Sequence, residues 1–219
     1  MPHDTSRPLH AGTPLADATG ALILVHGRGA LAESILTLGP EVAPDGVAVL
    51  APQAEGRTWY PHSFLAPLAA NAPWLPDAVD AVLRAIGTAE EAGLSRERIA
   101  VGGFSQGACL ALETVARAGG RWAGAFAFSG GLIGRRDVPG TPPFDKAFDY
   151  PSRLDGTPVF IGGSDVDPHI PLARMEQSAD ALRAVGATVE LRVYPGMGHT
   201  VHPGEIQAVR TMLAPLGAS

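Results

Sequence analysis

The residue whose context most clearly indicates a chemical role is Ser105. It lies at the centre of the segment Gly103–Gly107, which has the pattern G-x-S-x-G. An apolar run, Ile99–Val101, precedes this pentapeptide, and a helix-forming run begins at Ala108. Strand, sharp turn and helix form the context of a nucleophile elbow, in which the serine occupies a strained turn between small residues. The alternative is a glycine-rich turn with a bystander serine. The flanking strand and helix favour a nucleophile at Ser105, beside the free backbone N–H groups of a helix start.

A serine hydroxyl needs a base to become a good nucleophile, and His199 is the preferred candidate among seven histidines. It lies in Gly196–Thr200, a short glycine-rich loop just after the apolar run Val189–Val193. Loops at the C-terminal ends of strands are where alternating strand–helix proteins place ligand-facing groups. His202 is the rival, but it precedes Pro203 at the entry to a predicted helix, where capping or packing is the expected role.

A third group must orient the histidine and stabilise its charged form. Asp165 and Asp167 both follow the apolar run Val159–Ile161, and spacing alone does not choose between them. Capping of the turn or of the following helix is an alternative role for either aspartate.

A second backbone donor for an oxyanion is expected in the loop after an early strand. The residues Val25–Gly29, with the pattern V-H-G-R-G, end the apolar run Ala21–Val25 and continue into such a loop. We therefore expect the backbone N–H groups of Arg28 and Gln106 to form an oxyanion hole. His26 is expected to hydrogen-bond the loop, whereas the Arg28 side chain is expected to be solvated or to contact the substrate.

Six apolar runs alternate with helical patterns, which predicts a mostly parallel sheet covered by helices on both faces. The first five runs are continuous, as in strands buried on both sides, and the sixth alternates, which suits a position nearer the edge of the sheet. The predicted strands are Ala21–Val25, Val47–Leu50, Ile99–Val101, Ala125–Phe128, Val159–Ile161 and Val189–Val193. The predicted helices are Leu75–Glu91, Gln106–Ala118, Pro171–Val185 and Pro203–Leu213.

Two long segments, Ala51–Trp74 and Gly131–Pro158, interrupt this alternation and are rich in proline. Long loops in compact domains commonly build functional sites, and prolines such as those of the Pro139–Pro143 stretch are expected to stiffen them. The first segment is too aromatic for a solvated linker, so we interpret it as a wall over a substrate pocket. The alternative is a hydrophobic cluster that pins the loop. The expected pocket residues are Trp59, Tyr60, Phe64, Leu65 and Trp74.

Length and composition favour one domain over residues 1–219, in which residues 1–20 form an irregular arm or a short edge strand. The net charge of −6 argues against binding to duplex nucleic acid, and no apolar run approaches the ~20 residues of a membrane span. The single cysteine, Cys109, excludes an intrachain disulfide and fits a reducing compartment. Since the N-terminus also lacks the apolar core of a signal peptide, we expect a cytoplasmic protein.

Four elements together resemble the phospholipase/carboxylesterase family of α/β-hydrolases, which includes bacterial carboxylesterases and acyl-protein thioesterases. They are Val25–Gly29, Gly102–Ala108 (G-G-F-S-Q-G-A), Asp165–Pro171 (D-V-D-P-H-I-P) and the pair Gly198-His199. The resemblance covers residues 20–215 and implies an α/β-hydrolase fold, for which a length of 219 residues leaves little room for a large lid domain.

The resemblance also assigns roles to individual residues. It places the catalytic serine on Ser105, the histidine on His199 and the acid on Asp167, the aspartate directly before the proline. It places the oxyanion positions on Arg28 and Gln106. The chain order serine, aspartate, histidine is that of the α/β-hydrolases.

The implied activity is that of a serine carboxylesterase that cleaves small to medium acyl esters through an acyl-enzyme, without a metal or organic cofactor. Its expected partner is a small-molecule ester or thioester. Acyl-protein thioesterases usually carry an aspartate soon after H-G-x-G, where this sequence has Ala30–Ala32, and another after the aromatic pair, where it has Pro61. These departures favour a carboxylesterase over an enzyme that depalmitoylates proteins. Thioesters, lactones and lysophospholipids stay open as substrates, and an acyl-protein thioesterase-like or lysophospholipase-like enzyme is the alternative.

Two further alternative functions and one form of assembly are also considered. A dienelactone-hydrolase-like enzyme uses a cysteine at the elbow, whereas this sequence has Ser105 there and Cys109 four positions on, where a buried packing role is expected. A catalytically inactive binding module on the same scaffold is a second alternative, because fold does not imply function. Exposed aromatic residues on the long loop could also support a homodimer.

Overall fold

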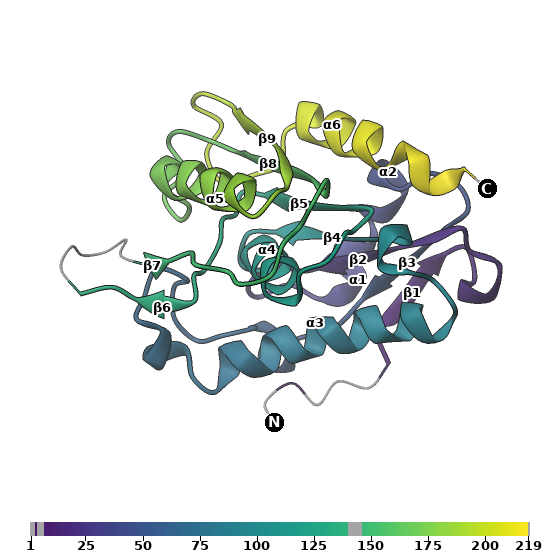
Figure 1. The fold of residues 1–219 in the computed structure, drawn as a ribbon, viewed down its shortest axis with the longest axis horizontal. Coiled ribbons are helices and arrows are strands. Elements are labelled where there is room, and N and C mark those ends of the chain that lie inside the picture. The colour runs from purple at the N-terminus through teal and green to yellow at the C-terminus, as the bar shows by residue number, and fades with distance from the viewer. Residues whose placement is uncertain (1–2, 4–6, 140–145, 219) are drawn as a thin grey trace.

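The computed structural model describes residue 3 and residues 7–139 and 146–218. Its centre is a seven-stranded sheet in the order β1-β3-β2-β4-β5-β8-β9, in which every neighbouring pair is parallel except β1 and β3 (Figure 1). The strands of this sheet are β1 (Leu9–Gly12), β2 (Gly20–Val25), β3 (Val47–Ala51), β4 (Ile99–Phe104), β5 (Gly124–Phe128), β8 (Pro158–Gly163) and β9 (Thr188–Val193). The prediction of a mostly parallel sheet is confirmed.

All six predicted strands are present in the sheet, and their burial explains their sequence patterns. Every residue of β2 and β5 is buried, because both strands lie inside the sheet with helices on either side. Strand β9 alternates between half-buried and exposed residues before ending in two exposed ones, and it forms one edge. Within residues 1–20, β1 forms the opposite edge by pairing antiparallel with β3.

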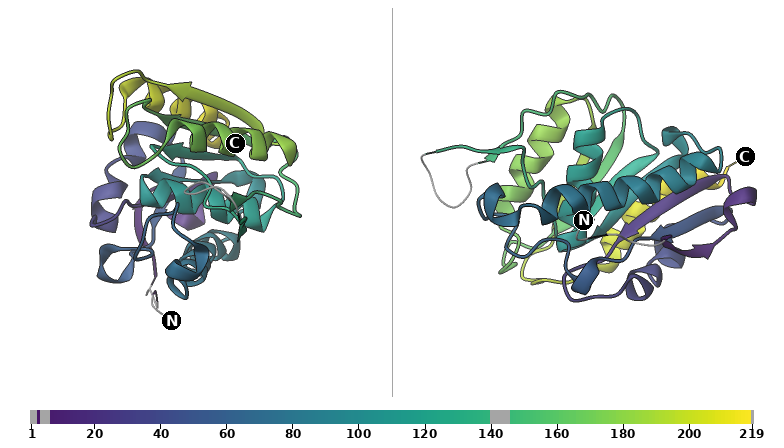
Figure 2. Two further views of the ribbon diagram at one scale, coloured as in Figure 1. Left: turned by 90° about the vertical axis from the view of Figure 1, so that its left-hand side faces the viewer. Right: turned by 90° about the horizontal axis from the view of Figure 1, so that it is seen from below.

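Helices cover both faces of the sheet, as the two turned views in Figure 2 show. Helices α3, α4 and α5 pack on one face, and α1, α2 and α6 pack on the other. Their bounds are α1 (Ala32–Leu36), α2 (Gly39–Val42), α3 (Trp74–Glu91), α4 (Gln106–Ala118), α5 (Leu172–Ala184) and α6 (Pro203–Leu213). The four predicted helices are therefore present, whereas the short α1 and α2 were not predicted. Of the described helices, none has both the length and the apolar character to cross a membrane.

The two long segments contain only short regular elements. The first holds the 3-10 turns η2 (Glu55–Arg57) and η3 (Leu68–Asn71), and the second holds a small ribbon of β6 (Arg136–Asp137) and β7 (Lys146–Ala147). Further 3-10 turns are η1 (Leu15–Asp17), η4 (Arg96–Arg98) and η5 (Ala214–Gly217). Apart from Pro139, the Pro139–Pro143 stretch lies outside the described residues.

The second long segment is attached to α4 by the buried carboxylate of Glu113. This carboxylate accepts hydrogen bonds from the backbone N–H groups of Ile133 (3.0 Å) and Gly134 (2.9 Å) and from the Tyr150 hydroxyl (2.7 Å), and it pairs with Arg117 (2.6 Å). A buried charge is tolerated when it is paired and fully hydrogen-bonded. The segment is therefore held against α4, the helix that begins directly after Ser105.

Candidate active site

The elbow around Ser105 is a strained turn between β4 and α4. Ser105 has φ 55° and ψ −121°, a backbone conformation that residues other than glycine rarely adopt. A Cβ atom at either Gly103 or Gly107 would collide with the backbone carbonyl oxygen of Val25. Small residues are thus required on both sides of the serine because the β2 backbone passes directly against the turn.

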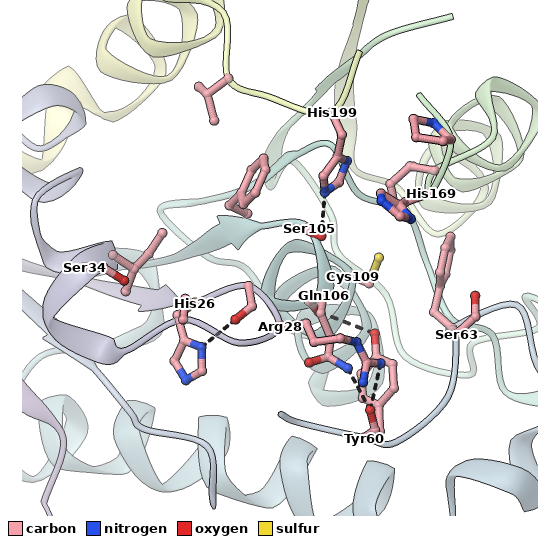
Figure 3. Close-up of a pocket in the computed structure, with 18 of the residues that line it drawn as sticks. His26, Arg28, Ser34, Tyr60, Ser63, Ser105, Gln106, Cys109, His169 and His199 are labelled. Carbon is pink, nitrogen blue, oxygen red and sulfur yellow. Dashed lines mark hydrogen bonds between the residues drawn. The ribbon is translucent and has the colours of Figure 1, made fainter. Parts of the chain in front are cut away.

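The three residues of the expected triad lie in one hydrogen-bonded chain. The Oγ atom of Ser105 is 2.8 Å from Nε2 of His199 (Figure 3). The Nδ1 atom of His199 is 2.7 Å from Oδ2 of Asp167. The Asp167 side chain is buried, and its Oδ1 accepts the backbone N–H groups of His169 and Ile170 at 2.8 and 3.1 Å. The carboxylate is therefore fixed in place and oriented toward the imidazole.

The rival residues take other roles. Asp165 accepts the backbone N–H of Gly196 at 2.8 Å, so it supports the loop that carries His199 rather than contacting the imidazole. His202 forms the N-cap of α6, where its Nδ1 accepts the backbone N–H of Gly204 at 2.9 Å. The capping role expected for His202 is confirmed.

The loop after β2 approaches the elbow from the other side. His26 holds this loop: its Nδ1–H donates to the Gly27 carbonyl (2.8 Å), and its Nε2 accepts the backbone N–H of Ala54 (3.1 Å). Burial lowers the pKa of His26, which favours the neutral ring that these two bonds require. Gln106 is the first residue of α4, where a backbone N–H has no partner within the helix.

A cleft of about 1040 Å³ opens in front of Ser105. Three of the expected pocket residues, Tyr60, Phe64 and Leu65, line it. It is also lined by apolar residues that sequence reasoning missed, namely Ile35, Leu38, Phe104, Ile170 and Val201. Phe104 and Ile170 lie within the motifs already identified and Val201 lies shortly after His199, so position was the signal for these three. Ile35 and Leu38 lie in and just after α1, which was not predicted. No large lid domain covers the cleft within residues 7–139 and 146–218.

Comparison with known proteins identifies the family. The family model described as Phospholipase/Carboxylesterase matches residues 13–216, which is nearly the whole chain. The chain belongs to the phospholipase/carboxylesterase family. The α/β-hydrolase fold expected from the resemblance is thereby confirmed.

Solved and curated relatives of this family member are consistent with that assignment. A phospholipase/carboxylesterase from Dyadobacter fermentans is 37% identical, with a TM-score of 0.87 over 96% of this chain and 97% of that one. The Bacillus cereus carboxylesterase has the same fold, with a TM-score of 0.68 over 94% of this chain and 93% of its own, at 19% identity. Acyl-protein thioesterase 1 of Gibberella zeae is 32% identical over 56% of this chain and 50% of its own. The chain thus spans about half the length of the curated relatives it matches.

Two expected pocket residues of this family member do not line the cleft. Trp59 is fully buried behind it, where its Nε1–H donates to the His26 carbonyl at 2.9 Å. Trp74, at the start of α3, packs against the His3 ring at a centroid distance of 5.5 Å. The expectation for these two tryptophans was wrong because they fill the space between the loop and α3, as the alternative of a pinning cluster describes.

Cys109 lies at the cleft wall but is poorly suited to act as a nucleophile in this family member. Its side chain is fully buried, and burial raises the pKa of the thiol to about 12. Its Sγ accepts the backbone N–H of Gly131 at 3.4 Å. These contacts fit the expected packing role. Among the described residues, no group of three or more His, Cys, Asp or Glu side chains is placed to hold a metal ion.

Glu205 makes the stability of the fold depend on pH. Its Oε2 accepts the backbone N–H of His202 (2.6 Å), and burial raises its pKa from 4.5 to about 7. Between these two values the folded chain keeps a proton that the unfolded chain releases. The free energy of unfolding should therefore fall by roughly 3 kcal/mol as the pH rises through this window. Glu205→Gln removes this loss, since the amide oxygen keeps the cap without titrating.

Urea denaturation at pH 5 and pH 8 measures this effect. The Glu205→Gln protein should gain stability relative to the unmodified chain as the pH rises. Glu176→Gln, which changes an exposed glutamate on α5, serves as the control for loss of one negative charge. The prediction is contradicted if the free energy of unfolding of Glu205→Gln differs from that of the unmodified chain by the same amount at pH 5 and at pH 8.

Proposed function

We propose that the chain is a serine carboxylesterase that hydrolyses small to medium acyl esters through an acyl-enzyme. The observation that carries this proposal is the continuous chain of hydrogen bonds from the Ser105 hydroxyl through His199 to the buried Asp167 carboxylate. A strained elbow that exposes the serine to a large cleft adds support. Membership of the phospholipase/carboxylesterase family supports the same reaction class.

In the proposed cycle, Ser105 Oγ attacks the ester carbonyl carbon while His199 Nε2 takes the hydroxyl proton. The backbone N–H groups of Arg28 and Gln106 stabilise the oxyanion. The carbon–oxygen bond to the alcohol then breaks, and His199 gives its proton to the leaving alcohol. Water attacks the acyl-enzyme with His199 as base, and the proton returns to Ser105 as the acid leaves. Asp167 keeps the imidazole in the required tautomer and stabilises its charged form.

Covalent labelling tests this proposal. A fluorophosphonate should modify the protein once, and peptide mapping should place the adduct on Ser105. Ser34 and Ser63 also line the cleft but have no histidine partner among the described residues, so they are internal controls. An adduct on either of them, or labelling that persists in Ser105→Ala, would contradict the assignment. An unlabelled protein that does not cleave 4-nitrophenyl acetate would support the inactive binding module.

Thioester hydrolysis is the second candidate, because the curated relatives carry the name acyl-protein thioesterase. A direct comparison uses 4-nitrophenyl butyrate and S-butyrylthiocholine, which share the acyl group and differ in the leaving group. The carboxylesterase proposal expects the higher kcat/KM for the oxygen ester after correction for the uncatalysed rates. The reverse order would favour the thioesterase.

We also propose a cytoplasmic location and a small-molecule ester as the partner. The location is supported by the absence of any possible intrachain disulfide, since Cys109 is the single cysteine of the sequence. Fractionation of the native organism tests it. Light scattering tests the homodimer. The expectation that aromatic residues of the long loop are exposed was wrong for Trp59, Tyr60 and Phe64, which are buried.

A further inference from the structure

The segment from Arg57 to His62 lies between the loop after β2 and the start of α4, and it is bonded to both. The guanidinium of Arg28 donates to three successive carbonyl oxygens of this segment, those of Tyr60 (2.9 Å), Pro61 (3.0 Å) and His62 (2.9 Å). Arg28 is exposed and lines the cleft, but its guanidinium is engaged by these three carbonyl oxygens. A planar guanidinium fork suits this set of acceptors better than a lysine ammonium does.

Gln106 binds the same segment from the other side. Its Oε1 accepts the backbone N–H of Trp59 at 3.0 Å, and its Nε2–H donates to the Tyr60 carbonyl at 2.8 Å. The Gln106 side chain is buried, so both of its polar ends exchange water for these backbone partners. A buried side-chain amide with both ends bonded is held in one orientation.

The Tyr60 carbonyl oxygen is the shared acceptor of these two side chains, and Figure 3 shows Arg28 and Gln106 converging on Tyr60. The same two residues supply the proposed oxyanion donors through their backbone N–H groups. Strands β2 and β4 are paired as far as Val25 and Gly103. Arg28 and Gln106 both lie beyond that pair, so strand pairing alone does not fix the distance between their N–H groups. Two further bonds hold the loops together, from the Gly29 N–H to the Arg57 carbonyl (2.7 Å) and from the Trp59 indole to the His26 carbonyl.

We propose that the side chains of Arg28 and Gln106 are positioning residues, which set the spacing of the oxyanion hole by clamping on the Tyr60 carbonyl. This inference rests on the proposed function. Oxyanion donors must lie 2.7–3.1 Å from the developing charge, and a misplacement of about 1 Å costs about 100-fold in rate. Loosening the clamp therefore reduces the stabilisation of the transition state more than the binding of the substrate. As a result, kcat falls while KM changes little.

The test uses Arg28→Leu and Gln106→Leu, which keep both backbone N–H groups and remove only the clamp. With 4-nitrophenyl acetate, kcat should fall by about 10- to 100-fold in each variant. Phenylboronic acid forms a tetrahedral adduct on a catalytic serine. Its inhibition constant should rise in the variants in which kcat falls. The combined variant should lose less than the product of the two single losses, because both side chains act through one carbonyl. Arg28→Lys should recover only part of the rate.

A matched control separates positioning from general stability. Arg98 also donates to backbone carbonyls, those of Thr19, Leu216 and Ala218, but it is not among the residues that line the cleft. Arg98→Leu should lower the thermal midpoint and leave kcat unchanged. Single variants with unchanged kcat, or fully multiplicative losses in the combined variant, would overturn the clamp. Failure of the unmodified protein to label at Ser105 or to turn over substrate would instead reject the proposed function itself.

Discussion

Replacing Ser105 or His199 by alanine should lower kcat for 4-nitrophenyl acetate by at least about 10⁴-fold, since a serine hydrolase that loses either group can lose about 10⁶-fold in kcat. The reason is geometric. His199 Nε2 lies 2.8 Å from the hydroxyl whose proton it must take, and among the described residues no other imidazole lies at hydrogen-bond distance from Ser105. Steady-state kinetics of the purified variants measures the loss, and circular dichroism checks that each variant is folded.

The acid of the triad provides the sharper comparison, since two aspartates follow β8. Asp167→Asn keeps the side-chain shape but presents an amide to His199 Nδ1, which favours the wrong tautomer and should cost about 10⁴-fold in kcat. Asp165→Asn is the matched control, because Asp165 bonds the backbone of Gly196 and does not touch the imidazole. Comparable losses in the two variants would contradict the assignment of Asp167.

Replacing Gly107 by alanine should destabilise the fold by at least about 3 kcal/mol, at the upper end for overpacking of a well-packed site. The new Cβ would meet the carbonyl oxygens of Val25 and His26. These are backbone atoms of the central sheet and of the loop after β2, which cannot rotate away as a flexible side chain can. The free energy of unfolding in urea measures the effect.

Gly87→Ala is the matched control for this prediction. Gly87 lies inside α3, and a Cβ atom there would have nothing within 4 Å. An alanine in a helix interior is more favourable than glycine by about 1 kcal/mol, so this variant should be slightly more stable than the unmodified chain. If Gly107→Ala and Gly87→Ala have equal stability, the close approach at the elbow is not a constraint on folding.

The parts of the molecule that sequence patterns could predict are those specified by neighbouring residues. Strand β2 reads as an unbroken apolar run, and α4 begins at the elbow and ends at a glycine, so both follow from local patterns. The juxtaposition of Ser105 and His199 follows as well, because loops after parallel strands meet at one edge of a sheet. Asp167 was separable from Asp165 only through the family resemblance.

The parts that sequence patterns missed depend on contacts between distant residues. Arg28 meets the Tyr60 carbonyl across 32 positions, and Gln106 meets it across 46. Trp59 carries the same apolar and aromatic signal as its neighbour Tyr60, yet only Tyr60 lines the cleft. Which side of a loop faces a cavity depends on the packing of other elements, in this case α3 and the β2 loop.

The position of β9 has a consequence for how the protein loses activity. Within the described residues this strand pairs with β8 alone, and His199 follows it on a loop held by Asp165. Outer strands open in sub-global fluctuations at lower free energy than inner ones. Ser105, by contrast, follows the fully enclosed β4. The proposed nucleophile and its proposed base therefore belong to regions of unequal local stability. Mild heat should abolish activity by displacing the loop that carries His199, while the amide groups of the inner strands are still protected from hydrogen exchange.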